Sequence, residues 1–146
     1  MLASIEHRGR DDSGRWVSEA IDSSQRRACL GHRRLAIIDT SPAGHEPMFS
    51  HDGRYVLTFN GEIYNYRELR EQLRSLGHEF RTDCDAEVLL EAISEWGWDA
   101  VNRLNGMFAF AVWDNTERTL TLARDHVGIK PLYYASIPDK NAFVFA

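Results

Sequence analysis

The chain has 146 residues, of which 43% are hydrophobic and 27% are charged, so that one globular domain over residues 1–146 with a sizeable core is expected. The formal net charge of −5 and the scattered arginines argue against nucleic-acid binding, which relies on basic patches facing phosphates. No apolar run approaches membrane-spanning length, and the first residues lack the apolar core of a signal peptide.

The first part of the chain predicts two strands separated by loops. Residues 7–16 (HRGRDDSGRW) predict a polar loop that ends in a Ser-Gly turn, and residues 41–53, with two prolines, predict a second, turn-rich loop. Residues 27–39 (RACLGHRRLAIID) predict a strand broken at Gly31. Residues 54–60 (RYVLTFN) are apolar at alternate positions and at most of those between, which predicts a strand buried on both faces.

Two amphipathic helices are predicted in the middle of the chain. Leucines recur at helical spacing between residues 65 and 76, and a glycine follows as a C-terminal stop: Leu69, Leu73, Leu76 and Gly77. The second helix lies in residues 84–97 (CDAEVLLEAISEWG), where Asp85 is placed to cap the start and Gly97 to end the helix. Its predicted apolar stripe consists of Leu89, Ile93 and Trp96.

Four further strands are predicted in residues 107–114, 118–125, 131–136 and 142–146, with a hairpin turn at residues 114–117. Strands therefore outnumber helices, and the helices are grouped together. This order favours an α+β fold, with helices packed on a largely antiparallel sheet, over a doubly wound parallel fold.

Asn60, Gly61 and Glu62 stand where the second predicted strand gives way to a helix. Asn-Gly alone is typical of a hairpin turn, but Ile63 and Tyr64 lead into a helix instead of another strand. A strand-to-helix loop with exposed backbone N–H groups is a plausible anion or oxyanion site. The local residues leave a turn and a binding site as alternatives.

Other candidates also have a structural and a functional interpretation. Arg33 and Arg34 are solvated by default, or one of them binds a carboxylate through its planar guanidinium. Asp85 is a helix cap by default and serves a pocket only if its second oxygen faces one. Cys29 and Cys84 fit small buried residues better than activated thiolates, so the chain offers a ligand pocket without an evident nucleophile.

The sequence predicts no metal site and no nucleotide site. The six histidines do not fall at metal-ligand spacing, and neither a phosphate-binding P-loop nor a dinucleotide fingerprint is present. The two cysteines lack the spacing of a disulfide framework, which suits a reducing cytoplasm.

The chain resembles the class II glutamine amidotransferase domain of glutamine-hydrolysing asparagine synthetases in six motifs that occur in order: HRGRDDSG, GHRRLAIID, FNGEIYNYRELREQL, CDAEVLLEAI, LNGMFAFAVWD and RDHVGIKPLYY. The resemblance implies an N-terminal-nucleophile hydrolase fold, an αββα sandwich in which two antiparallel sheets lie between helices. It also implies a mechanism in which an N-terminal cysteine attacks the amide of glutamine, and the released ammonia passes to an ATP- and Mg-dependent synthetase domain that amidates aspartate.

The resemblance implies roles for seven residues. Arg34 would bind the α-carboxylate of glutamine, and the main chain around Ile37 and Ile38 would line the same pocket. Asn60 and the N–H of Gly61 would form the oxyanion hole. The amino group of the substrate would be received by the carboxylates of Glu62 and Asp85.

The chain also departs from the family pattern. Arg10 replaces a proline, and the strand and most of the helix that precede His7 in the family are not in this sequence, which leaves it without the nucleophilic cysteine. The C-terminal synthetase domain of the family is not in this sequence either. We therefore expect a glutaminase-domain fragment that binds glutamine and needs no cofactor of its own. The alternative is a non-catalytic glutamine-binding or scaffold domain of a related synthetase. The oligomeric state is left open, with a homodimer as one arrangement.

Overall fold

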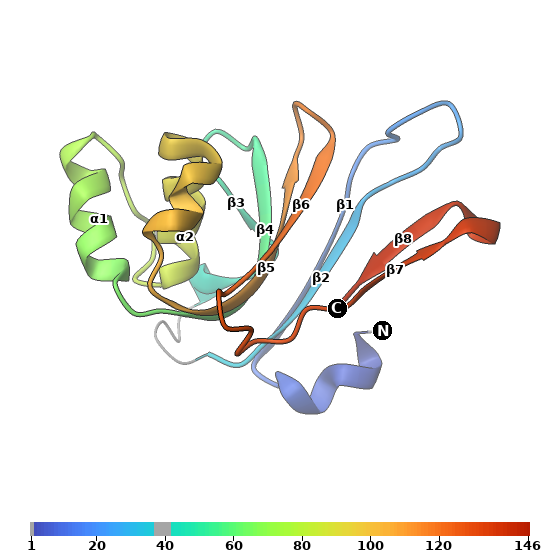
Figure 1. Ribbon diagram of the computed structural model, residues 1–146, viewed down its shortest axis with the longest axis horizontal. Helices are drawn as coiled ribbons and strands as arrows, with labels where there is room; N and C mark the ends of the chain where they lie inside the picture. The colour runs from blue at the N-terminus through green and yellow to red at the C-terminus, as the bar shows by residue number, and fades with distance from the viewer. Residues whose placement is uncertain (1, 37–41) are drawn as a thin grey trace.

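The computed structural model describes residues 2–36 and 42–146 (Figure 1). Its strands are β1 (Asp12–Val17), β2 (Cys29–Arg34), β3 (Met48–Phe49), β4 (Tyr55–Ile63), β5 (Gly106–Asp114), β6 (Thr119–Arg124), β7 (Tyr134–Ile137) and β8 (Ala142–Phe145). The α-helices are α1 (Tyr66–Ser75) and α2 (Asp85–Trp96), and the 3-10 helices are η1 (Ala3–Arg8), η2 (Pro42–Gly44), η3 (Gly97–Arg103) and η4 (Pro138–Lys140).

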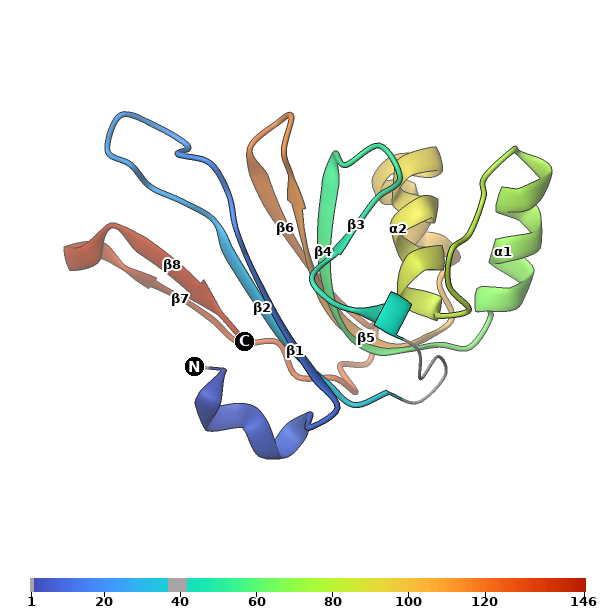
Figure 2. The same ribbon diagram turned by 180° about the vertical axis from the view of Figure 1, so that it is seen from behind.

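The described strands pair only in the antiparallel direction. They form a four-stranded sheet in the order β3–β4–β5–β6 and two hairpins, β1–β2 and β7–β8. Both α-helices cover one face of the four-stranded sheet, and the hairpins lie on its other side (Figures 1 and 2). The predicted α+β class is confirmed, with helices on an antiparallel sheet.

β4 is one of the two central strands of this sheet, and its side chains alternate between two apolar clusters. Leu57 and Phe59 pack with the helices, whereas Val56 packs against Leu30 of β2 and Trp113 of β5. A strand buried on both faces was expected from its nearly continuous apolar sequence, and this prediction is confirmed.

The β1–β2 hairpin has a further layer on its outer side. Leu30 is buried against the four-stranded sheet, so the next residue of β2, Gly31, faces the opposite way. A Cβ atom at Gly31 would lie 3.1 Å from the side chain of Leu2, which places the start of the chain on this outer face. The order of layers is therefore helices, four-stranded sheet, hairpin and the η1 segment.

The predicted helices are present, with small corrections. Leu69 and Leu73 are buried and Gly77 follows the helix with a φ of +99°, as expected, but Leu76 is 54% exposed because it is the C-cap and faces away from the sheet. In α2 the N-cap position is taken by Cys84, and Asp85 is the first helical residue, so the predicted cap was placed one residue too late.

The first strands differ most from the predictions. Residues 12–17 form β1 instead of a loop with a Ser-Gly turn, and β2 runs without a break through Gly31, which pairs with Arg15. Pairing between the two strands supplies hydrogen bonds that local turn propensity does not reveal. The strands predicted in residues 107–114, 118–125 and 142–146 are confirmed, and β7 begins at Tyr134, later than expected.

Within the described residues, no helix combines the length and the apolar character that crossing a bilayer requires.

Candidate functional site

Five of the predicted site residues line one cavity of about 310 Å³ between β2, the end of β4 and the start of α2: Arg34, Asn60, Gly61, Glu62 and Asp85. Ile37 and Ile38, the other two, lie outside the described residues. The structure thus brings together residues that are up to 51 positions apart in the chain (85 − 34). Their individual roles stay predictions.

Asn60, Gly61 and Glu62 lie within β4, which corrects both local interpretations. They pair with Ala109, Phe108 and Met107 of β5, so they form neither a hairpin turn nor a strand-to-helix loop. The functional groups are presented by a strand edge instead. β3 has only two residues and pairs with β4 no further than Leu57, so within residues 2–36 and 42–146 the later part of this edge has no partner strand.

Two buried carboxyl groups accept hydrogen bonds along this edge. The N–H of Phe59 donates to Oε2 of Glu46 at 2.6 Å, and the N–H of Ile63 donates to Oδ2 of Asp85 at 2.9 Å. Gly61 lies midway between these residues, and alternate N–H groups of a strand point to the same side. The N–H of Gly61 therefore points away from β5 and toward the cavity.

The partner of Gly61 on β5 supports this orientation. The N–H of Phe108 donates to Oδ2 of Asp125 at 3.2 Å, and its carbonyl oxygen accepts from the N–H of Asp125 at 2.8 Å. Both backbone groups of Phe108 are thus engaged on the side away from β4, which makes Gly61 and Phe108 a pair without mutual hydrogen bonds. A Cβ atom at Gly61 would lie 2.7 Å from the Cα of Phe108, so the close approach of the two strands requires glycine.

A second glycine makes room for Arg34. A Cβ atom at Gly44 would lie 2.7 Å from the Cζ atom of the Arg34 guanidinium, so the side chain of Arg34 lies directly against the backbone of η2. Any larger residue at position 44 would displace the guanidinium from this side of the cavity.

The cavity also contains charged and polar groups that the sequence did not single out. Glu46 and His32 line it, and Arg8 and Lys130 contribute two further cations. Glu46 lies in the predicted turn-rich loop, where no local pattern signals that its side chain is only 6% exposed. Alternation along β2 could have placed His32 on the same face as Arg34.

Burial dominates the electrostatics of this site. Desolvation raises the pKa of Glu46 to about 8 and, together with the nearby charge of Arg34, lowers the pKa of His32 to about 4. Desolvation also raises the pKa of Asp85, although hydrogen bonds from the N–H groups of Ile63 and of the first helical turn oppose the change. At neutral pH the Glu46 and His32 side chains are therefore both uncharged.

The two cysteines differ in their surroundings. Cys84 is buried at the cavity wall with its Sγ 2.8 Å from Oγ1 of Thr82, and burial raises the pKa of its thiol. Cys29 is exposed on β2, so the expectation that it is buried was wrong. The raised pKa of Cys84 keeps the pocket cysteine in the unreactive thiol form.

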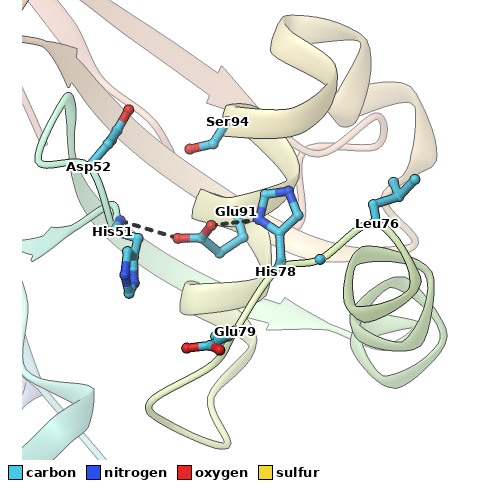
Figure 3. Close-up of a pocket in the computed structure, with 8 residues that line it drawn as sticks. His51, Asp52, Leu76, His78, Glu79, Glu91 and Ser94 are labelled. Atoms are coloured by element: carbon cyan, nitrogen blue, oxygen red, sulfur yellow. Dashed lines mark hydrogen bonds and ion pairs between the residues drawn. The ribbon is translucent and has the colours of Figure 1, made fainter.

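A separate cavity of about 370 Å³ lies beside the middle of α2 and holds none of the predicted residues (Figure 3). There Glu91 accepts hydrogen bonds from the backbone N–H of His51 at 3.3 Å and from the His78 ring at 2.8 Å. The second ring nitrogen of His78 bonds Glu95 at 2.9 Å. These groups satisfy one another and tie the α1–α2 connection to α2 and to the β3–β4 turn.

In the part of the chain that the structure describes, no three histidine, cysteine or acidic side chains are grouped so that they could hold a metal ion.

Comparison with known sequences identifies similar proteins. The family described as "Glutamine amidotransferase domain" matches residues 1–146. Asparagine synthetase (glutamine-hydrolyzing) 1 of Bacillus subtilis strain 168 is 45% identical over 139 residues, which are 95% of this chain and 21% of the relative. Asparagine synthetase (glutamine-hydrolyzing) 3 of the same strain is 40% identical over 147 residues, 99% of this chain and 22% of the relative. The chain thus spans about a fifth of the length of these relatives.

Comparison with solved structures gives the same kind of fold. The glutamine phosphoribosylpyrophosphate amidotransferase of B. subtilis, in complex with ADP and GMP, superimposes with a TM-score of 0.74 at 24% identity. The match covers 94% of this chain and 36% of that one. The structural comparison therefore confirms the N-terminal-nucleophile amidotransferase fold that the six motifs imply.

Proposed function

Because the chain belongs to the glutamine amidotransferase domain family, we propose that its cavity binds L-glutamine as the glutamine-handling part of an enzyme related to the asparagine synthetases. The observation that carries the proposal is the convergence of a guanidinium, two carboxylates and the N–H of Gly61 on one cavity of about 310 Å³. Such a volume suits a small ligand, and the opposite charges suit a zwitterion.

The two charged groups of glutamine bind on different sides of the cavity. Arg34 of β2 binds the α-carboxylate of glutamine through its fork of N–H donors. The carboxylates of Glu62 and Asp85, from β4 and α2, receive the α-ammonium group. A ligand that lacks either charge forms fewer charge-assisted hydrogen bonds in the cavity, which selects for free amino acids.

The edge of β4 faces the reacting amide in this arrangement. The side-chain amide of Asn60 and the N–H of Gly61 donate to the oxygen that becomes negative when a nucleophile attacks the glutamine side chain. Loss of one such donor typically costs about 2.7–4 kcal/mol of barrier. Asp85 and Glu46 accept the neighbouring N–H groups and so hold the edge in place for this purpose.

Hydrolysis needs a nucleophile that neither cysteine of this chain supplies. Cys84 is protonated and hydrogen-bonded to Thr82, and Cys29 is not among the residues that line the cavity. In the complete enzyme that we propose, a cysteine thiolate would attack the amide, and ammonia would pass to a synthetase domain that uses ATP and Mg for the amidation of aspartate in the cytoplasm. This chain contributes binding and positioning.

The proposal is tested by calorimetric titration of the chain with L-glutamine and D-glutamine, together with an assay of ammonia release. We expect saturable binding of the L isomer only, without ammonia release. Arg34→Lys keeps the charge but loses the planar fork, so the affinity should fall about tenfold. Arg74→Lys on the exposed face of α1 serves as the matched control and should bind as wild type does.

The outcomes separate the alternatives. Binding of L-glutamine without hydrolysis supports a glutamine-binding unit. Ammonia release by the isolated chain would contradict the proposal that the nucleophile is not part of this chain. Absence of binding at millimolar L-glutamine, with a folded chain in hand, would overturn the proposed function and favour a scaffold role.

A further inference from the structure

We propose that Lys130 is a further ligand-binding residue of this cavity: its ammonium group binds the side-chain end of the ligand, and Asp125 positions it there. The identity of the ligand rests on the proposed function. The placement of Lys130 rests on the contacts of the connection between β6 and β7, in which it lies.

The side chain of Asp125 anchors this connection to β5. Asp125 is only 5% exposed, and both of its carboxylate oxygens accept backbone hydrogen bonds. Oδ1 accepts the N–H of Ile129 at 2.9 Å, and Oδ2 accepts the N–H of Lys130 at 3.0 Å. Oδ2 also accepts the N–H of Phe108 in β5 at 3.2 Å. One buried carboxylate thus fixes the backbone of Lys130 against the sheet.

A tight turn decides which side chain of the connection reaches the cavity. The N–H of Gly128 donates to the carbonyl oxygen of Asp125 at 3.1 Å, and Gly128 has a φ of +69°, which favours glycine. Val127 and Ile129 on this turn are 81% and 58% exposed, so their side chains point to solvent. Lys130 is half-buried and lines the cavity instead.

The anchoring contacts place Lys130 at the level of Gly61 along the sheet. A single atom, Oδ2 of Asp125, joins the N–H of Lys130 to the N–H of Phe108. Phe108 in turn is the β5 partner of Gly61 in β4. The N–H of Gly61 points into the cavity, toward the side-chain amide of glutamine in the proposed arrangement. Since Lys130 lines the same cavity, its ammonium group approaches the side-chain end of the ligand.

The charge of Lys130 lacks a counter-ion in the part of the chain that the structure describes. Within residues 2–36 and 42–146, no carboxylate oxygen lies within the 4.0 Å of an ion pair with its nitrogen. Arg33, which lines the same cavity, pairs with Glu6 at 3.2 Å. Partial burial removes water from the Lys130 ammonium, so a ligand oxygen that accepts its hydrogen bond gains a charge-assisted contact.

The chemistry of the ligand decides how strong this contact is. Glutamine presents a neutral amide oxygen at its side-chain end, whereas glutamate presents a γ-carboxylate there. An ammonium group attracts the carboxylate more strongly than the amide, because both partners of the hydrogen bond then carry charge. Lys130 should therefore increase the affinity of the cavity for L-glutamate relative to L-glutamine.

The test is calorimetric titration of L-glutamate and L-glutamine into wild type, Lys130→Met, Lys130→Arg and Lys140→Met. Methionine keeps an unbranched apolar side chain without the charge, and arginine keeps the charge. Lys140, the only other lysine of the sequence, is exposed on η4 and does not line the cavity. Its substitution therefore controls for the change of net charge.

We expect Lys130→Met to weaken the binding of glutamate about tenfold more than the binding of glutamine. Lys130→Arg should retain most of the preference for glutamate, and Lys140→Met should retain all of it. Equal weakening of both ligands by Lys130→Met, or no weakening of either, would overturn the placement of Lys130 while leaving the glutamine site intact. If wild type binds neither ligand, the proposed function fails and this inference fails with it.

Asp125→Asn tests the positioning role separately. The amide offers one acceptor oxygen in place of two, so it cannot hold the N–H groups of Ile129 and Lys130 as the carboxylate does. We expect it to reduce the preference for glutamate, and to reduce it no further when combined with Lys130→Met, because both changes act through the same ammonium group. Additive changes in the two variants would overturn positioning by Asp125. Lys130→Met leaves the backbone contacts of Asp125 in place, so it tests the binding role even if Asp125→Asn does not fold.

Chemical modification of lysine provides a second measurement on the unaltered protein. Acetic anhydride acetylates accessible lysines, and mass spectrometry resolves the two sites because the chain has only Lys130 and Lys140. Saturating L-glutamate should slow the acetylation of Lys130 and leave that of Lys140 unchanged. Equal acetylation of Lys130 with and without bound glutamate would contradict a contact between its ammonium group and the ligand.

Discussion

The helix-covered sheet and the outer hairpins bury their side chains in different ways. On the helix side of β3–β6, a continuous cluster joins β4, β5, α1 and α2, and Leu57, Leu73, Val88 and Leu89 have no exposed surface. On the other side, a smaller cluster of Leu30, Val56, Ala111 and Trp113 connects the sheet to the hairpins. The hairpin β7–β8 carries large exposed side chains on both strands.

This difference explains where the cavity lies. The N–H donors and Asp85 come from the well-packed side, whereas Arg34 and His32 come from the hairpin side. The rigid half therefore positions the groups that would face the reacting amide, and the less tightly packed half supplies the arginine. Substitutions on the helix side should therefore lower the free energy of unfolding more than substitutions on the hairpin side.

The largest effect is expected from Phe108→Ala in β5. The Phe108 ring is 2% exposed and lies 5.6 Å from the ring of Phe110, so its removal leaves a cavity in the main cluster. We expect the free energy of unfolding to fall by about 3–5 kcal/mol, measured by urea denaturation. A loss below 1 kcal/mol would contradict the view that this side holds the fold together.

A smaller effect is expected from Gly61→Ala. The new Cβ would press on the backbone of Phe108 and force β4 and β5 apart, which should cost about 1–3 kcal/mol and also weaken glutamine binding. Gly31→Ala in β2 is the matched control, because the atoms nearest its Cβ belong to the flexible side chain of Leu2 and not to the backbone. Equal losses of unfolding free energy at positions 31 and 61 would contradict the proposed difference between the helix side and the hairpin side.

The His78 contacts should make the stability of the helix side depend on pH. Burial opposes the charge on the His78 ring, but hydrogen bonds to Glu95 and Glu91 outweigh it and raise the pKa above the ordinary value of 6.5. The stabilisation is fully present below pH 6.5 and is lost as the pH rises through the folded-state pKa.

The matching experiment is urea denaturation of wild type and His78→Gln at pH 6 and pH 8. Wild type should exceed the variant by about 1 kcal/mol more at pH 6 than at pH 8. An identical difference at both values would mean that the ring is not charged between the two carboxylates.

The smallest effect is expected from Phe143→Ala in β8. The Phe143 side chain is 52% exposed and stacks on Tyr134 with ring centroids 5.9 Å apart. Its removal should lower the free energy of unfolding by less than about 1 kcal/mol, because little apolar surface leaves water on folding. A loss close to that of Phe108→Ala would show that the hairpins carry as much of the stability as the helix side.

The same contrast governs what could be predicted from sequence. β4 and both helices have strong periodic patterns, so their type and approximate bounds followed from the residues alone. β1 was missed and β2 was expected to break at Gly31, because each strand forms through its partner across a hairpin rather than through local preference.

The site was predictable in composition but not in arrangement. The six motifs named five residues that line the cavity, although the presentation of Asn60 and Gly61 by a strand edge was not foreseen. Glu46 could not be predicted as a site residue from the sequence. Its burial results from packing between β2 and β4, and the residues around it in the sequence do not indicate this burial. Local sequence reports periodicity, whereas the pKa of a carboxyl depends on what the rest of the chain packs against it.

The edge of β4 that lines the cavity has a consequence for amide hydrogen exchange. The amides of Phe59 and Ile63 donate hydrogen bonds to the carboxyl groups of Glu46 and Asp85, whereas the amide of Gly61 between them faces the open cavity. Three N–H groups on one edge should therefore exchange with deuterium at a slow, a fast and a slow rate. A bound ligand that accepts the middle hydrogen bond would slow that one amide selectively, which turns Gly61 into a residue-specific reporter of occupancy.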